Sequence, residues 1–276
     1  MTFTRTAGTW FHRVRARNRV GSCDAISAWS AAVSVIVTDD PIAAMRVIPV
    51  VGSTRGDAGS FFKTSVQLYN PTAAGISGRI VFHPQGVAEG QSDTVLAYSI
   101  APGKTVTYDD LLPAMGLANG IGSADIVADI AGDQSVALPL AVVRIFNDAG
   151  VAGTTGLVEE PMRPEDALRA GDTGVIIAPD DFAKFRLNIG VRSLEDGASM
   201  DITVRDRDGI VVATFAREYA PQFFEQTAAS SFLGGHVLFG GETISLTLTR
   251  GAAIVYGSIT DNVTNDPAQQ FARRLE

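Results

Sequence analysis

Cysteine is almost absent from this sequence of 276 residues. Cys23 is the single one, which excludes an internal disulfide framework and any zinc site built on several cysteines. No apolar run approaches the roughly 18 residues of a membrane-spanning segment. The opening residues MTFTRTAGTW contain no apolar stretch after a basic start, so they carry no export signal. We expect no membrane span in the chain, and any export signal is expected upstream of Met1.

Basic charge is also scarce. Lys and Arg number 22 against 30 Asp and Glu, for a net charge of −8. Five Arg against three Asp give residues 1–40 a charge of +2, which leaves −10 for the remainder. Nucleic-acid affinity depends mostly on Lys and Arg that neutralise phosphates, so nucleic acid is not an expected partner. The Arg residues of the opening segment alternate along a predicted strand, which favours a solvated strand face over a nucleic-acid patch.

Residues for catalysis are few. A serine triad needs a histidine, and His12, His83 and His236 are the three available. His236 follows Gly234-Gly235 and lies near Ser230 and Ser231, which makes it the candidate base, and the alternative is a surface or loop histidine. The sequence contains no GxSxG elbow and no HExxH, Walker A or dinucleotide-binding motif after a strand. We expect no enzyme activity, no catalytic residues, no metal site and no cofactor.

Short apolar runs of period two, separated about every ten residues by Gly, Pro, Asn or Asp, predict an all-β sandwich architecture. Residues 46–158 and 170–267 follow the same plan of strands and turns, which predicts two homologous immunoglobulin-like sandwiches in tandem. Each plan includes an Ala-Pro corner, and the endings AVVRIFND and VYGSITDN match Ile145 with Ile259 and Asn147-Asp148 with Asp261-Asn262. Residues 147–172 are expected to be a linker or crossing loop, and residues 268–276 a tail.

The two best-matched strands predict which side chains face inward. Phe62 and Phe185 begin the two runs and are expected at equivalent buried positions. The other residues expected to face inward are Thr64, Val66, Leu68, Leu187, Ile189 and Val191. Lys63, Ser65, Gln67, Arg186, Asn188 and Arg192 are expected to face outward.

The opening segment has a pattern of its own. WFHRVRARNRVGS and SAWSAAVSVIV place Trp10, Val14, Ala16 and Asn18 before a Gly21-Ser22 turn and Trp29-Ser30 with Val33, Val35 and Val37 after it. This pattern resembles the last two strands of a fibronectin type III domain, with Trp10 in place of the usual corner tyrosine. The resemblance covers residues 1–38, so residues 1–40 are expected to be the end of an incomplete domain. Either the reading frame is truncated or the hairpin borrows a second sheet from its neighbour.

The tandem repeat, which closes with YGSITDNVTNDP at Tyr256 to Pro267, is similar to poorly characterised β-sandwich repeats of large exported bacterial proteins. Those repeats bring no known activity with them. Their usual setting implies a secreted or cell-surface location and a partner that is a protein or a glycan.

Three loops offer candidate sites. Asp206, Asp208 and Gly209 superficially resemble a calcium loop but lack its remaining ligands, and they fit a hairpin turn better. Asp261, Asn262, Asn265 and Asp266 are expected to bond to their own backbone, although Asn262-Val263-Thr264 also forms a glycosylation sequon. Arg55-Gly56-Asp57 is a tripeptide that some adhesion proteins display to integrins. The alternative interpretation of these residues is a solvated loop that links two strands.

The function that these observations favour is a non-catalytic structural or binding module of a larger bacterial protein: a spacer, a stalk or an adhesion platform. One alternative is a carbohydrate-binding module, which requires aromatics exposed on one flat face; Tyr69, Tyr98 and Phe223 do not form an obvious set. The other alternative is an accessory domain of a secreted hydrolase.

Overall fold

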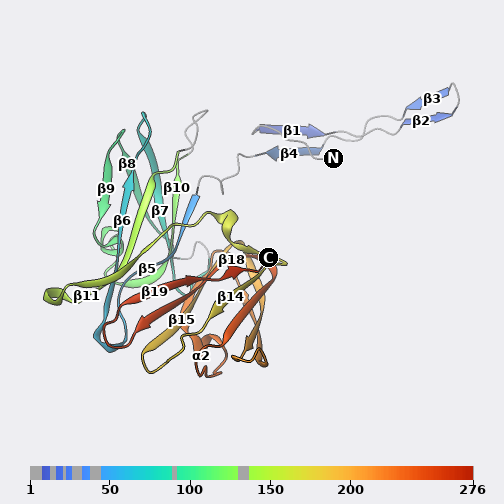
Figure 1. The fold of residues 1–276 in the computed structure, drawn as a ribbon. Helices are drawn as coiled ribbons and strands as arrows, with labels where there is room; N and C mark the ends of the chain where they lie inside the picture. The colour runs from blue at the N-terminus through green and yellow to red at the C-terminus, as the bar shows by residue number, and fades with distance from the viewer. Residues whose placement is uncertain are drawn as a thin grey trace. The chain divides into compact units, whose positions relative to one another are not determined.

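Strands make up most of the chain in the computed structural model, which describes residues 8–12, 17–20, 23–26, 33–37, 45–88, 92–129 and 137–275. The chain divides into two compact units, residues 1–43 and 44–276, whose strands are drawn in Figure 1. Every ladder among the described strands is antiparallel. None of the helices in these parts of the chain is long and apolar enough to cross a membrane.

The N-terminal unit consists of two paired ribbons. β1 (Gly8–His12) pairs with β4 (Val33–Val37), and β2 (Arg17–Val20) pairs with β3 (Cys23–Ile26). The antiparallel pairing expected of this segment is therefore present, while its fibronectin-like character stays a prediction. Arg13, Val14, Arg15 and Ala16 lie outside the described residues, and so does the burial of Trp10.

The second unit begins with a sandwich of two sheets. One sheet has the order β5-β10-β7-β8; the other has the order β12-β11-β6, with β9 also paired to β6. β5 joins both sheets, because its first part pairs with β10 and its end pairs with β6. The elements are β5 (Met45–Arg55), η2 (Asp57–Gly59), β6 (Phe61–Tyr69), β7 (Ile76–Pro84), β8 (Thr94–Ile100), β9 (Thr105–Tyr108), α1 (Leu111–Ala114), β10 (Gly120–Ala128), β11 (Leu140–Asp148), η3 (Gly150–Ala152) and β12 (Thr154–Glu159).

The core of this first sandwich confirms the alternation that the sequence shows. Thr64, Val66 and Leu68 on β6 are fully buried, and the exposed Gln67 stands between them. Val66 and Leu68 pack in one cluster with residues of the facing sheet such as Ile80 and Ile126. Period two in a strand therefore places one face of each sheet in the core.

The second sandwich is built on two long, bent strands. β15 and β18 pair along almost their whole lengths within one continuous sheet, and register shifts near residues 193–200 bend the pair. Gly197 and Gly251 stand at the bend with φ of 68° each, and a Cβ on Gly251 would lie 2.0 Å from the Gly197 carbonyl oxygen. The elements are η4 (Pro164–Asp166), β13 (Leu168–Arg169), β14 (Thr173–Ile177), β15 (Phe185–Arg205), β16 (Val211–Tyr219), β17 (Phe224–Ala228), α2 (Ala229–Phe232), β18 (Thr243–Asp261), β19 (Pro267–Phe271) and β20 (Arg273–Arg274).

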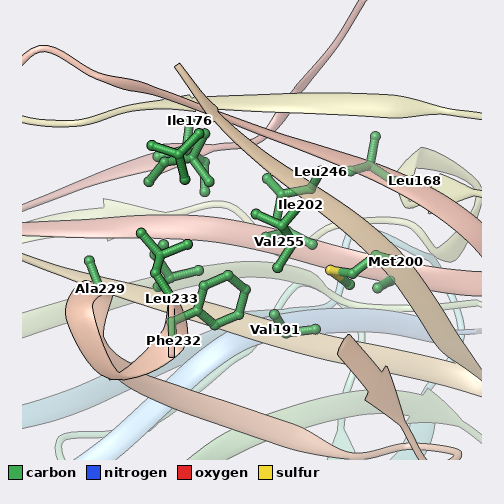
Figure 2. Packing of buried hydrophobic residues seen from close by; sticks show 14 of the residues in the cluster. Leu168, Ile176, Val191, Met200, Ile202, Ala229, Phe232, Leu233, Leu246 and Val255 are labelled. Atoms are coloured by element: carbon green, nitrogen blue, oxygen red, sulfur yellow. The ribbon is translucent and has the colours of Figure 1, made fainter. Parts of the chain in front are cut away.

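Apolar side chains from all parts of this sandwich meet in one core. Figure 2 shows Ile202 and Leu246 close to Val255, with Phe232 of α2 and the adjoining Leu233 closing one side. Phe232 is fully buried. At about 25 cal/mol per Å² of apolar surface, such a core is sufficient to hold a short helix of four residues in place.

Two central strand pairings correspond between the two sandwiches. The pair β6 and β11 of the first sandwich corresponds to the first half of β15 paired with the second half of β18 in the second sandwich. The pair β7 and β10 corresponds to the second half of β15 paired with the first half of β18. The registers also correspond, because Phe62 lies opposite Asn147 and Phe185 lies opposite Asp261. Both phenylalanines are half-buried instead of buried. A common origin of the two halves stays a prediction.

Three expectations about boundaries and faces are wrong. Residues 147–172 are not a linker, because β12 within them extends the first sandwich. Residues 268–276 are not a tail, because β19 and β20 pair with β18 and β14. Arg192 does not face solvent, because its side chain is 1% exposed. The first two errors share a cause: each segment follows a loop rich in Gly, Pro or Asn and is too short to show a clear period.

Candidate functional site

The two sandwiches of the second unit are packed against each other through two apolar clusters. In one cluster, Met45 and Val47 of the first sandwich contact Leu194 and Ile254 of the second. In the other, Val50 contacts Phe224 and Tyr256. Buried apolar contact of this kind holds the two sandwiches together, and the segment that connects them is bound to the first sandwich by hydrogen bonds of 2.8 Å in both directions between Met162 and Val47.

A buried charged network spans the same junction. The Asp125 carboxylate of β10 accepts a hydrogen bond of 2.9 Å from the Arg192 guanidinium of β15 and lies 2.9 Å from Nε2 of His83 on β7. Nδ1 of His83 lies 3.3 Å from the Asp93 carboxylate. Burial alone would raise the pKa of the Asp125 carboxyl, but the charges and hydrogen bonds of Arg192 and His83 outweigh it and hold that pKa below its usual value. Removing one member would leave a buried charge without its partner.

Glu159, at the end of β12, is a second buried acid. Its side chain is fully buried, and its Oε1 accepts a hydrogen bond of 2.8 Å from the Gln269 amide of β19. Burial raises the pKa of the Glu159 carboxyl to about 8, against the lowering effect of the bonds from Gln269 and the Val50 backbone. Its Oε2 has no hydrogen-bond partner among the described residues. At neutral pH this carboxyl is therefore mostly protonated.

Beyond these contacts the facing sheets separate and leave a cleft of about 280 Å³. One wall is the face of the second sandwich formed by β17, β15, β18 and β19. Pairing places Asn188 beside Ser258 and Ser258 beside Gln269, so that these three side chains form one row across the sheet. Gln226 stands one row further in, and Arg186 and Thr260 one row further out. This wall offers amides and hydroxyls.

The opposite wall belongs to the first sandwich and is largely apolar. Its side chains come from strands of both sheets: Val50 on β5, Phe62 on β6, Ile121 on β10, Ile145 on β11 and Leu157 on β12. Phe62 is the one aromatic side chain that lines the cleft among the described residues. The exposed Gln85, just after β7, lies at the inner end, where its Oε1 accepts a 3.2 Å bond from the Gln226 backbone.

The loop predicted as an interaction site lies at the rim of this cleft. Arg55, Gly56 and Asp57 are exposed and line its edge. The loop is held by bonds of 3.1 Å from the Gly56 amide to the Ser60 carbonyl and from the Ser60 amide to the Asp57 carbonyl. The Asn265 amide of the second sandwich donates to the carbonyl of Ala58 at 3.2 Å. The structure thus joins this loop to the cleft, while its role in binding stays a prediction.

The histidines that the sequence offered for catalysis lie in different surroundings. His83 is buried in the charged network, and His12 falls in β1, where side chains lie outside the described residues. The ring centroid of His236 lies 6.2 Å from that of Phe215. Among the described hydrogen bonds, none joins His236 to Ser230 or Ser231, both of which are exposed on or beside α2. The absence of enzyme activity stays a prediction.

The acidic loops bond to their own backbone. Oδ1 of Asp206 accepts bonds from the amides of Asp208 at 3.0 Å and Ile210 at 2.9 Å, and Gly209 has φ of 80°. Oδ1 of Asp261 likewise accepts bonds from the amides of Val263 at 2.8 Å and Thr264 at 2.7 Å. The turn interpretation is confirmed for Asp206 and Asp261, whereas the side chains of Asn262 and Asn265 bond to residues far along the chain. Among the described residues, no group of three or more His, Cys, Asp and Glu side chains could hold a metal ion.

The aromatic side chains considered for sugar binding lie apart from one another, and the sequon asparagine is hydrogen-bonded within the protein. Tyr98 is buried and donates to the Val127 carbonyl at 3.1 Å, Tyr69 is exposed on β6, and Phe223 packs beside Tyr219 with ring centroids 5.9 Å apart. These three rings form no common face. The amide of Asn262 in the sequon donates to the carbonyls of Phe182 at 3.3 Å and Ala183 at 3.2 Å.

Sequence reasoning missed the residues of the junction. Glu159 carried a usable signal, because alternation along β12 puts it on the same face as Leu157. No sequence signal indicated the role of Arg192. Alternation along β15 correctly predicts that its side chain faces away from its own core, but it cannot show that a second sandwich lies on that side. A comparison with protein-family models found no match, and a search of curated proteins found none either.

Proposed function

We propose that residues 45–275 form a non-catalytic binding module of a larger exported bacterial protein, at the cell surface or outside the cell, and that its ligand occupies the cleft between the two sandwiches. The observation that carries this proposal is the cleft itself. Its walls are side chains on strands of two sandwiches that a buried junction holds together. A ligand entering it meets a site that is already formed, which lowers the ordering cost of binding.

The chemistry of the lining supports binding over catalysis. The cleft presents amides, hydroxyls and apolar side chains, with Arg55, Asp57 and Arg186 as its charged residues. Arg186 donates to the carbonyl of Asp261 at 3.3 Å and to Oδ1 of Asn265 at 2.8 Å. A nucleophile with an adjacent base, which covalent catalysis needs, is not among the lining residues. The exported setting rests on the resemblance of the repeat to modules of exported proteins.

The test fills the cleft without disturbing the fold. A Cβ on Gly52, which lines the cleft, would meet its nearest atom at 3.4 Å, so the backbone there has room for a Cβ, and the melting temperature of the Gly52→Leu variant checks that it folds. Gly75→Leu is the matched control, because Gly75 is exposed outside the cleft and its Cβ would meet one atom at 3.9 Å. The full chain and both variants are applied to arrays of glycans and extended peptides.

We expect the wild type and Gly75→Leu to retain a ligand that Gly52→Leu loses, with circular dichroism and melting temperature unchanged. If every retained ligand binds Gly52→Leu as well as wild type, or if the arrays retain nothing, the cleft is not a binding site and the proposal is wrong.

A further inference from the structure

We infer that the cleft binds a neutral carbohydrate of one or two sugar rings, with its apolar ring face on the first sandwich and its hydroxyls on the second. This inference rests on the proposed function and names the chemical class of its ligand. A sugar ring has an apolar face of C–H groups and an edge of hydroxyls. The two walls of the cleft divide in the same way, since Val50, Phe62 and Ile145 face Asn188, Ser258 and Gln269 across it.

The polar wall has hydrogen-bonding capacity left for a ligand. Within the described residues, neither Asn188 nor Ser258 makes a side-chain hydrogen bond to the protein. Gln226 accepts a 2.8 Å bond from the Tyr256 hydroxyl through Oε1, which leaves its NH₂ group as a donor. Gln269 donates through Nε2 to Glu159, which leaves its Oε1 as an acceptor. Sugar hydroxyls both donate and accept, so they match a row that presents both kinds of group.

The spacing of the row also suits a sugar. Directly opposite residues on neighbouring strands stand about 5 Å apart, which is close to the width of a pyranose ring. Asn188 and Ser258 are such a pair, and so are Ser258 and Gln269. The volume of about 280 Å³ lies just below the roughly 300 Å³ at which typical ligand pockets start. One or two rings can therefore enter, while a longer chain must extend beyond the rim.

Charge favours a neutral ligand over an ionic one. Arg186 is held by Asp261, Asn262 and Asn265. Arg55 and Asp57 at the rim carry opposite charges, and the guanidinium of Arg55 lies over the Phe61 ring at 5.6 Å from its centroid. An anionic sugar would find two cations that are already engaged, Arg186 and Arg55, and the nearby carboxylate of Asp57.

An extended peptide is the competing occupant, and the geometry disfavours it. Peptides that add to sheets gain affinity from main-chain bonds to an open strand edge. The central strands of the polar wall, β15 and β18, are each already paired on both sides. The cleft therefore offers side chains of sheet faces, which recognise hydroxyls better than a peptide backbone.

The test uses the full chain on an array of neutral mono- and oligosaccharides, anionic glycans and extended peptides. Affinity for the best-retained neutral oligosaccharide is then measured by isothermal titration calorimetry. The variants Asn188→Ala and Ser258→Ala remove one row member each. Gln67→Ala is the control, because Gln67 is exposed on β6 and does not line the cleft.

We expect each row variant to raise Kd roughly two- to tenfold, as the loss of one neutral hydrogen bond would, and Gln67→Ala to leave Kd unchanged. Binding of a peptide or an anionic glycan that Gly52→Leu abolishes would overturn the carbohydrate inference and leave the binding function standing. A neutral glycan bound equally by Asn188→Ala, Ser258→Ala and wild type would also overturn it. If no probe binds in a manner that depends on the cleft, both the inference and the proposed function are wrong.

Discussion

Glu159 makes the stability of the two-sandwich unit depend on pH in a direction that can be worked out. The pKa of its carboxyl is raised from an ordinary 4.5 to about 8 in the folded protein, so the folded state holds a proton that the unfolded state releases. The contribution to folding is then fully present below about pH 4.5 and is lost as the pH rises toward 8. The wild type should therefore become less stable across this window.

The magnitude follows from the size of the shift. One pKa unit corresponds to 1.36 kcal/mol, so a shift of this size makes ionised Glu159 cost roughly 3 to 6 kcal/mol above pH 8. Glu159→Gln keeps an oxygen to accept the bond from Gln269 and cannot ionise. The variant should match the wild type at pH 5 and exceed its free energy of unfolding by several kcal/mol at pH 8.5.

Urea denaturation of both proteins at pH 5, 7 and 8.5 measures this difference. Taking variant minus wild type cancels groups that titrate in both proteins, including the Asp125 carboxyl, whose pKa is lowered. A difference that stays constant from pH 5 to 8.5 would refute the reasoning, because it would show that Glu159 does not change its protonation in this range when the protein folds.

Two further predictions concern the junction and the opening unit. Arg192→Ala leaves the Asp125 carboxylate buried without its guanidinium partner and should lower the free energy of unfolding by about 3 to 5 kcal/mol; a urea midpoint within error of the wild type would contradict this. Removal of residues 1–40 should leave the melting temperature of the remainder nearly unchanged, because the described strands of that unit pair with one another, and a large drop in calorimetry would show that the segment supports the sandwiches.

The sequence was sufficient to predict the sheets, because each strand carries its own alternation. On β6, the buried Thr64, Val66 and Leu68 and the exposed Gln67 follow from period two alone. The turns were equally local, since Asp206 and Asp261 accept hydrogen bonds from backbone amides within four positions of them. Such features depend on neighbours in the chain, which a sequence shows directly.

The residues of the junction depend instead on partners far away along the chain. Arg192 and Asp125 are 67 positions apart, and Gln269 and Glu159 are 110 apart. Alternation assigns each strand an inner and an outer face, but it does not say whether water or another sheet covers the outer one. Arg192 was therefore expected in solvent, although its outer face is an interface.

The same reasoning explains why the cleft and the junction occur together. On the face of β15 that turns away from its own core, Arg186 and Asn188 line the cleft, Gly190 makes room for the ring of Tyr256, and Arg192 reaches Asp125. A Cβ on Gly190 would lie 2.0 Å from that ring, so a larger residue there would displace the Tyr256 ring, which packs against Val50 of the first sandwich. Within a few residues, the same face of β15 thus lines the open cleft at Asn188 and forms the buried ion pair with Asp125 at Arg192. Because Asn188 and Arg192 lie on the same face of one strand, the buried contact of Arg192 helps to set the position of Asn188 relative to Phe62. A substitution that loosens Arg192 should therefore make the positions of the cleft residues less well defined.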